Sequence, residues 1–329
     1  MYRIQTMNKI SPVGLNRFPT ELYEVGDTVQ DPQGILVRSA KLLDMEFNPG
    51  LLAIARAGVG VNNIPLDRCS EQGIVVEGLT VRSEDGIIKL DDVSFTANSG
   101  EILGIAGISG CGQKELLEAI AGLQPVEKGS IRYVEDDAAQ EELVGKDPLS
   151  IASLGVSLSF VPEDRLGMGL VGNMDLTDNM MLRSFRRGHS PFANRKAPKS
   201  LAEQVVKELE VNTPSVATPV RKLSGGNVQK VLVGREIAQS PSVLMTAYAV
   251  RGLDINTSYT IYNLLTEQKM KGVAVVYVGE DLDVLLELCD RIVVLCGGQV
   301  SGVVDARKTD KRQVGVLMTR VEGGKAKNE

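Results

Sequence analysis

The chain has 329 residues, of which 43% are hydrophobic and 24% charged, and its formal net charge is −6. This length suits two or three domains of ordinary soluble composition. The acidic balance and the absence of tryptophan argue against a nucleic-acid partner, which favours a basic face and stacking aromatic side chains. No run of about 18 apolar residues occurs, so we expect no membrane span.

The four cysteines are scattered without a C-x-x-C pair, and the only histidine is His189. This spacing argues against a structural zinc site or a disulfide framework and favours a reducing compartment. His189 lies in the polar stretch RRGHSPF, where we expect a surface loop. A Ser-His-Asp triad is therefore not expected.

Residues 1–76 alternate apolar runs with turns. GILVRSA (34–40) and LLAIARAGVGVNNI (51–64) each predict a strand followed by a loop, and PLDRCSEQG (65–73) predicts a short helix before the strand IVV. Strands that alternate with helices predict a parallel sheet. We place a domain boundary after Val76.

Residues 77–320 follow a different pattern. The segment 77–101 predicts antiparallel strands around an EDG turn, and 136–147 is acidic and predicts an exposed loop. Between about 166 and 238 the spacing is helical, and MGLVGNMDLTDNMML within it fits either a partner groove or ordinary core. We expect the tail, 321–329, to be disordered.

The last third of the chain alternates buried strands with helices. SVLMT, VAVVYV and RIVVLC predict strands, and NTSYTIYNLLTEQKM and DLDVLLEL predict helices, the first with Asn256 as its cap. The glycine pair 297–298 predicts a hairpin. This alternation predicts an α/β fold around a largely parallel sheet.

The stretch GISGCGQKE (107–115) lies between the strand-like EILGIAG and the helix-like KELLEAIAGL. A strand, a glycine-rich turn and a helix form the context of a phosphate-binding loop, G-x-x-x-x-G-K-[ST], whose backbone N–H groups cradle phosphate. Gln113 stands in the lysine position and Lys114 in the Ser/Thr position. The candidate nucleotide-binding residues are Gly107, Ser109, Gly110, Cys111, Gly112, Gln113, Lys114 and Glu115.

A second glycine motif, KLSGGNVQK (222–230), stands directly before a predicted helix. It offers a hydroxyl, free N–H groups and the positive end of a helix dipole to an anion. Together with GISGCGQKELLEAIAGLQP, FVPEDRLGMGLV and RGLD, this motif makes residues 77–320 resemble an ATP-binding cassette (ABC) ATPase domain. The resemblance is to the second cassette of the importers for sugars and nucleosides, and it implies an α/β P-loop NTPase fold with antiparallel β and helical subdomains.

The resemblance also implies roles and partners. Glu163 falls in the Q-loop and Asp254 in the D-loop, and the implied ligand is ATP, with weaker support for Mg²⁺. The implied partners are a second cassette paired head to tail, transmembrane permease subunits at the cytoplasmic face of the cell membrane and, indirectly, a solute-binding protein. The signature that would cap ATP on the facing cassette comprises Leu223, Ser224, Gly225, Gly226, Asn227 and Gln229.

The departures from the family pattern concern hydrolysis. Ala247 stands at the magnesium-aspartate position, Tyr248 at the catalytic-glutamate position and Glu280 at the switch-histidine position. Phosphoryl transfer depends on positioning and charge neutralisation, and loss of the general base alone costs roughly 10²–10⁴ in rate. We therefore expect a degenerate ATP site with an intact signature. The alternative is a structural turn in a non-catalytic fusion protein.

Residues 1–76 resemble the start of a D-2-hydroxyacid dehydrogenase such as phosphoglycerate dehydrogenase. VRSAKL and AIARAGVGVNNIPLDRCSEQGIVV carry the match, which stops at Val76. The resemblance implies a truncated, flavodoxin-like piece of a substrate domain, or the remnant of an NAD-dependent enzyme. The implied substrate-loop residues are Arg38, Ser39, Gly58, Gly60 and Asn62.

We predict that the chain does not bind nicotinamide cofactors, because it contains no strand–G-x-G-x-x-G–helix unit. Titration of the chain with NADH, followed by the fluorescence of the cofactor, measures this. A saturable signal in the micromolar range would contradict the prediction.

Overall fold

The computed structural model describes residues 2–8, 10–42, 45, 51, 53–57, 73–83, 85–136, 139–185 and 194–319. It divides the chain into two compact units, Met1–Ser70 and Glu71–Glu329. The predicted boundary after Val76 instead lies inside strand β5 (Gly73–Arg82). The apolar run IVV, expected in the first sheet, pairs with antiparallel strands of the second unit, because an apolar run fits either kind of sheet.

The first unit contains one four-stranded sheet in the order β2-β1-β3-β4. All of its strand pairs are parallel, in agreement with the alternating pattern of the sequence. Ile35, Val37 and Leu42 form its small buried cluster. The predicted helix at 65–73 lies outside the described residues. The elements are β1 (Tyr2–Met7), α1 (Pro12–Leu15), β2 (Tyr23–Gly26), β3 (Gly34–Val37) and β4 (Ala53–Arg56).

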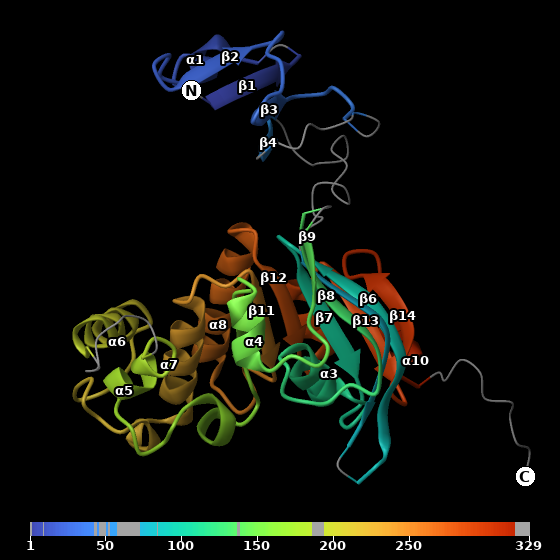
Figure 1. Ribbon diagram of the computed structural model, residues 1–329, viewed down its shortest axis with the longest axis vertical. Helices are drawn as coiled ribbons and strands as arrows, with labels where there is room; N and C mark the ends of the chain where they lie inside the picture. The colour runs from blue at the N-terminus through green and yellow to red at the C-terminus, as the bar shows by residue number, and fades with distance from the viewer. Residues whose placement is uncertain are drawn as a thin grey trace, which may run out of the picture. The chain divides into compact units, whose positions relative to one another are not determined.

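The second unit is built on a six-stranded sheet in the order β10-β11-β12-β7-β13-β14 (Figure 1). Five strands are parallel, and β14 runs antiparallel to β13 after the predicted glycine hairpin. Strand β7 therefore lies in the interior of the sheet. The strands are β7 (Ile102–Gly107), β10 (Leu158–Val161), β11 (Val243–Ala247), β12 (Ala274–Val278), β13 (Arg291–Cys296) and β14 (Gln299–Asp305).

A second, antiparallel sheet has the order β6-β5-β8-β9. Its other strands are β6 (Ile88–Asn98), β8 (Lys128–Asp136) and β9 (Ala139–Glu142). The expectation of a loop throughout 136–147 was wrong in part, since β9 pairs with β8 there. At the end of β9, the Glu142 carboxylate also accepts the backbone N–H of Ile131 at 3.0 Å.

Helices fill the segment between β10 and β11, as the spacing predicted. The elements there are η1 (Arg165–Gly169), α5 (Leu176–Met181), α6 (Lys196–Glu208), η2 (Val220–Lys222) and α7 (Gly225–Ile237). The remaining helices are α3 (Gln113–Ile120), α4 (Pro148–Ser153), α8 (Ile255–Met270), α9 (Leu282–Leu288) and α10 (Lys311–Thr319). Among the described residues, none of these helices has the length and apolar character to cross a membrane. The tail 321–329 is outside the described residues.

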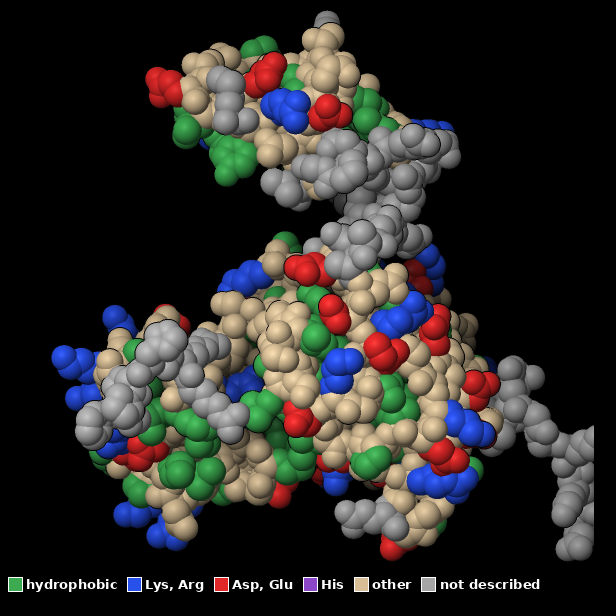
Figure 2. Space-filling model, viewed as in Figure 1, with side chains coloured by type: hydrophobic (Ala, Val, Ile, Leu, Met, Phe, Trp, Pro, Cys, Tyr) green, Lys and Arg blue, Asp and Glu red, His purple; other side chains and the backbone are tan. Residues whose placement is uncertain are grey.

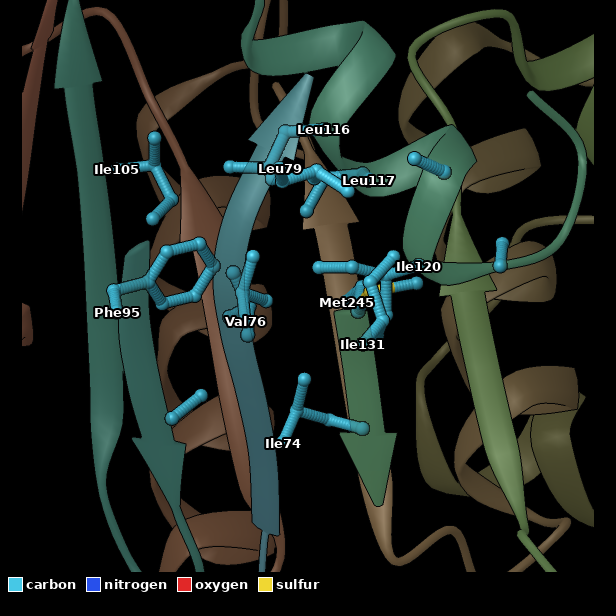
Figure 3. Close-up of a cluster of buried hydrophobic side chains, with 14 of the residues drawn as sticks. Ile74, Val76, Leu79, Phe95, Ile105, Leu116, Leu117, Ile120, Ile131 and Met245 are labelled. Carbon is cyan, nitrogen blue, oxygen red and sulfur yellow. The ribbon is translucent and has the colours of Figure 1, made fainter. Parts of the chain in front are cut away.

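The inner strands β7, β11, β12 and β13 of the six-stranded sheet are buried on both faces, and alternate residues along them enter different cores. In β12, Val276 and Val278 join the core that contains α3 and the antiparallel sheet, while Val275 and Tyr277 join the core that contains α6, α7 and α8. Figure 3 shows the first core, in which Leu116 and Leu117 of α3 lie near residues of both sheets. Burial on both faces explains why these strands read as continuous apolar runs.

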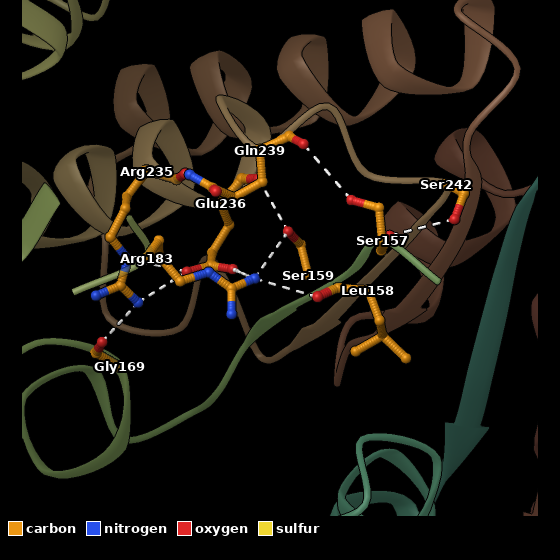
Figure 4. Close-up of polar contacts among 9 residues, drawn as sticks. All are labelled: Ser157, Leu158, Ser159, Gly169, Arg183, Arg235, Glu236, Gln239 and Ser242. Carbon is orange, nitrogen blue, oxygen red and sulfur yellow. Dashed lines mark hydrogen bonds and ion pairs between the residues drawn. The ribbon is translucent and has the colours of Figure 1, made fainter. Parts of the chain in front are cut away.

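A buried ion network connects α7 to the sheet (Figure 4). Arg235 and Glu236 of α7 are both buried, and their side chains lie 2.8 Å apart. Arg183 approaches the other carboxylate oxygen of Glu236 at 2.9 Å, as an ion pair without the alignment of a hydrogen bond. Arg235 also donates to the carbonyl of Gly169 at 2.7 Å, and Ser159 of β10 donates to the carbonyl of Glu236 at 2.9 Å. Burial lowers the pKa of Arg235, so this charge depends on Glu236 for compensation.

We predict that Glu236→Gln destabilises the second unit by about 3–5 kcal/mol, because it leaves the buried Arg235 charge without its counter-ion. The measurement is the free energy of unfolding in urea. The control is Glu203→Gln, which removes an exposed partner 3.8 Å from Lys199 and should cost less than about 1 kcal/mol. Equal effects of the two substitutions would contradict the role assigned to the buried network.

Candidate nucleotide-binding site

The predicted phosphate loop lies between the buried strand β7 and helix α3. Gly110 and Gly112 adopt φ values of 87° and 97°, in the region that favours glycine. A Cβ atom on Gly112 would lie 2.5 Å from the carbonyl of Lys89, so the turn also requires a residue without a side chain. Within the described chain, the backbone N–H groups of Ser109, Gly110 and Gly112 donate to no acceptor. The loop therefore retains the free N–H groups that a phosphate requires.

The Gln113 side chain lies within this loop. It is buried, and its Nε2 atom donates to the carbonyl of Ile108 at 3.1 Å. The same nitrogen is 2.6 Å from the position that a Cβ atom of Gly107 would occupy. A neutral amide thus takes the place where a phosphate loop normally carries a lysine charge.

Lys114 does not replace that missing charge in the structure. Its amine is exposed and lies 3.7 Å from the carboxylate of Glu118, one turn further along α3. Burial raises the pKa of Glu118, and the neighbouring Glu115 adds to this effect while Lys114 opposes it. The charges of Lys114 and Glu115 therefore act on Glu118 of the same helix.

The expected catalytic positions lie at the ends of β11 and β12. Ala247 is the last residue of β11 and is buried, so its methyl group offers no ligand to a metal. Tyr248 follows it with φ 52°. Burial and the nearby carboxylates of Glu163 and Glu280 raise the pKa of Tyr248. The phenol therefore stays protonated near neutral pH and cannot accept a proton from water as a carboxylate base would.

Four side chains meet at this edge of the sheet, and we call them the Arg251 cluster: Glu163, Tyr248, Arg251 and Glu280. The Arg251 guanidinium lies 2.5 Å from Glu163 and 3.6 Å from Glu280. It also lies over the Tyr248 ring, 5.9 Å from the centroid. The sequence analysis named the other three residues but missed Arg251, which stands next to the predicted D-loop in VRGLD.

The predicted signature lies at the start of α7. Ser224 caps the helix, and its hydroxyl accepts the side-chain N–H of Asn227 at 2.9 Å. Ser224 and Gly225 are exposed. A Cβ atom on Gly225 would lie 3.3 Å from one terminal nitrogen of the Arg165 guanidinium. The other terminal nitrogen donates to the carbonyl of Arg251. The sequence analysis missed Arg165 as a neighbour of the signature.

Two further predicted site residues, Asp254 and Gln229, differ in solvent accessibility. Asp254 caps α8, because its carboxylate accepts the Thr257 N–H at 2.9 Å and the Thr257 hydroxyl at 2.7 Å. The expectation that Asn256 caps this helix was therefore wrong. Gln229 is fully buried inside α7 and its amide has no partner among the described residues. It is thus separated from the exposed part of the signature.

The dehydrogenase-like residues of the first unit can be placed only in part. Arg38 and Ser39 are exposed and follow β3, where the Ser39 N–H donates to the side chain of Asn8 at 3.1 Å. Gly58, Gly60 and Asn62 lie outside the described residues, as does His189. No arrangement for acid binding can be built from Arg38 and Ser39 by themselves.

The described residues include no group of three or more His, Cys, Asp and Glu side chains that could hold a metal ion. At the loop, Lys114 and Ala247 replace the hydroxyl and the carboxylate that Mg²⁺ would require, since Mg²⁺ prefers oxygen ligands. The residues present therefore do not fit Mg²⁺ at this site. The backbone of the loop does fit a phosphate group.

Residues 90–246 match the model of the ABC transporter family. Solved cassettes have the same fold. A bacterial ABC transporter cassette solved as a dimer is 22% identical, with a TM-score of 0.61 over 72% of this chain and 100% of that one. A dimeric cassette in a post-hydrolysis state with ADP and Pi gives a TM-score of 0.60 at 22% identity, with the same coverage. The second unit therefore has the fold of an ABC transporter ATPase cassette.

This cassette resembles import ATP-binding proteins for nucleosides and sugars. The guanosine import ATP-binding protein NupO of Bacillus subtilis (strain 168) is 32% identical over 88% of this chain and 57% of NupO. The xylose import ATP-binding protein XylG of Moorella thermoacetica is 36% identical over 71% of this chain and 45% of XylG. The galactose/methyl galactoside import ATP-binding protein MglA of Vibrio vulnificus is 30% identical over 91% of this chain and 59% of MglA.

The alignments cover different shares of this chain and of its relatives. The chain spans about half the length of the curated relatives it matches. The alignments with NupO and MglA cover more of the chain than the second unit alone, so they extend into the first unit. The dehydrogenase resemblance of residues 1–76 finds no support in these relatives.

We predict that the chain alone hydrolyses ATP slowly or not at all, because Ala247 and Tyr248 replace the metal-binding and basic carboxylates. Steady-state phosphate release measures this, and a rate roughly 10²–10⁴ below that of an intact cassette is expected from loss of the base. A turnover of several per second that disappears on substitution of Gln113 would contradict the prediction.

Proposed function

We propose that this chain is an ATP-binding cassette subunit that energises import of a nucleoside or a sugar. In this proposal its own ATP site is degenerate, and its signature completes the ATP site of a facing cassette. The observation that carries the proposal is the contrast between the two motifs. Ser224 and Gly225 are exposed at the start of α7, whereas Gln113, Ala247 and Tyr248 have lost the charged chemistry of the loop site.

The geometry of the signature suits a phosphate presented from outside. Helix α7 has 13 residues, and the first N–H groups of such a helix have no partner within it. The Ser224 hydroxyl and the N–H groups of Gly225 and Gly226 can therefore donate to the γ-phosphate of ATP held on the other cassette. Gly225 lets the backbone come close, which a β-carbon would obstruct.

The relatives support the transport role. NupO, XylG and MglA are import ATP-binding proteins for guanosine, xylose and galactose or methyl galactoside, respectively. Related cassettes have been solved as dimers, which supports head-to-tail pairing with a second cassette. Import also requires permease subunits and, indirectly, a solute-binding protein. The proposed location is the cytoplasmic face of the cell membrane.

An apolar surface on the helical subdomain supports contact with a permease. Figure 2 shows hydrophobic side chains gathered over this part of the second unit, around α5. Soluble proteins seldom expose contiguous apolar patches unless a partner covers them. The segment MGLVGNMDLTDNMML, for which core and partner groove were both open, contributes to this surface. The exposed residues are Leu166, Met168, Val171, Met174 and Phe185.

We predict that Ser224→Arg or Gly225→Asp abolishes ATP turnover of the assembled importer. Each lost charge-assisted hydrogen bond is worth about 1.5–3 kcal/mol, so loss of two or three lowers the rate by orders of magnitude. The measurement is ATP turnover of the reconstituted complex that contains a catalytically intact facing cassette.

The matched control for this measurement is Gln113→Ala in the same complex, which should change turnover little. Because Gln113 belongs to the chain's own loop, it does not contact ATP on the facing cassette in this proposal. If Gly225→Asp leaves turnover intact while Gln113→Ala removes it, the roles proposed for the two motifs are reversed.

A further inference from the structure

The Arg251 cluster carries an excess of negative charge at the edge of the sheet where the loop lies. Two carboxylates, Glu163 and Glu280, share the single guanidinium of Arg251, with separations of 2.5 Å and 3.6 Å. Tyr248 remains protonated and adds no charge. The four side chains of the cluster therefore carry a net charge of −1, and the three charged ones are about half exposed.

The cluster lies beside the phosphate loop. Strand β12, which leads to Glu280, pairs directly with β7, which leads into the loop. Strand β11, which leads to Tyr248, is the next strand in the sheet. Cys111 of the loop and Tyr248 also pack against the same buried core, the one that contains α3. A phosphate chain that extends from the loop toward β12 and β11 therefore approaches Glu280 and Glu163.

The loop itself supplies no compensating cation. Gln113 is neutral and its amide is bonded to the carbonyl of Ile108. The Lys114 amine lies near Glu118, on the flank of α3. The residues around the loop do not fit Mg²⁺, as argued above. Phosphates bound here are thus held by backbone N–H groups, which form an anion-binding concavity.

We propose that the chain's own loop binds a nucleoside diphosphate and discriminates against the γ-phosphate of ATP, with Glu163 and Glu280 as the specificity-determining residues. The inference rests on the proposed role of the loop as a phosphate site. The third phosphate adds negative charge next to two carboxylates, whereas the α- and β-phosphates remain within the N–H groups of the loop. Exposed charge pairs each contribute modestly, so we expect the two carboxylates together to disfavour ATP about tenfold.

The test is equilibrium binding of ADP and of ATP to the full chain by calorimetry, with EDTA and no added Mg²⁺. We expect ADP to bind about tenfold more tightly than ATP. The ratio should fall as ionic strength rises, because the cluster is partly exposed and salt screens it. This comparison needs no substitution, so it does not depend on whether a variant folds.

The double substitution Glu163→Gln and Glu280→Gln identifies the residues responsible. It should tighten ATP binding about tenfold and leave ADP binding within about twofold of the original value. The control is Glu203→Gln on α6, an exposed carboxylate that pairs with Lys199, and it should leave both affinities unchanged.

Three results would overturn the inference. Tighter binding of ATP than of ADP would mean that Arg251 leaves its carboxylates to hold the γ-phosphate. An unchanged ratio of ADP affinity to ATP affinity in the double variant would mean that Glu163 and Glu280 do not discriminate between the two nucleotides. Failure of both nucleotides to bind would remove the phosphate-loop role itself. The signature proposal is tested separately, because its measurement reads ATP turnover on the facing cassette.

Discussion

The burial of strand β7 on both faces is the constraint on which the candidate site depends. β7 pairs with β12 on one side and β13 on the other, and its side chains alternate between the two cores of the second unit. Because β10, β11, β12 and β7 are parallel, their carboxyl ends lie at the same edge of the sheet. The glycine-rich loop after β7, Glu163 after β10, and Ala247 and Tyr248 at the end of β11 therefore meet there.

At this edge, the backbone keeps the geometry of a phosphate-binding loop, whereas the side chains differ from those that ATP hydrolysis requires. The glycine turn keeps its left-handed residues and free N–H groups, because these depend only on the chain path set by β7 and α3. At the positions where the resemblance to an ABC ATPase predicts charged side chains that bind phosphate and metal and activate water, this chain has an amide, a methyl group and a phenol. The carboxylates that remain, Glu163 and Glu280, are neutralised in part by Arg251.

Helix α7 carries both the predicted signature and part of the buried ion network. Its first residues carry the exposed signature, and its last turn carries Arg235 and Glu236 of the buried network. That network contacts β10 through Ser159 and η1 through the Gly169 carbonyl. A helix fixed so firmly at one end presents Ser224 in a defined position relative to the sheet, which precise contact with a partner's phosphate requires.

Local sequence determined the elements of the second unit and the identity of its motifs. Apolar runs, helical spacing and glycine turns depend on neighbouring residues, so they predicted β7, α3, the helical subdomain and the start of α7. Tertiary structure decided the rest, because those features depend on residues far apart in the chain. The run IVV could pair with either sheet, and its partners in β6 and β8 made it part of the cassette. Likewise, Arg251 acquires its role only by meeting Glu163, 88 residues earlier, at an edge of the sheet that only the folded chain creates.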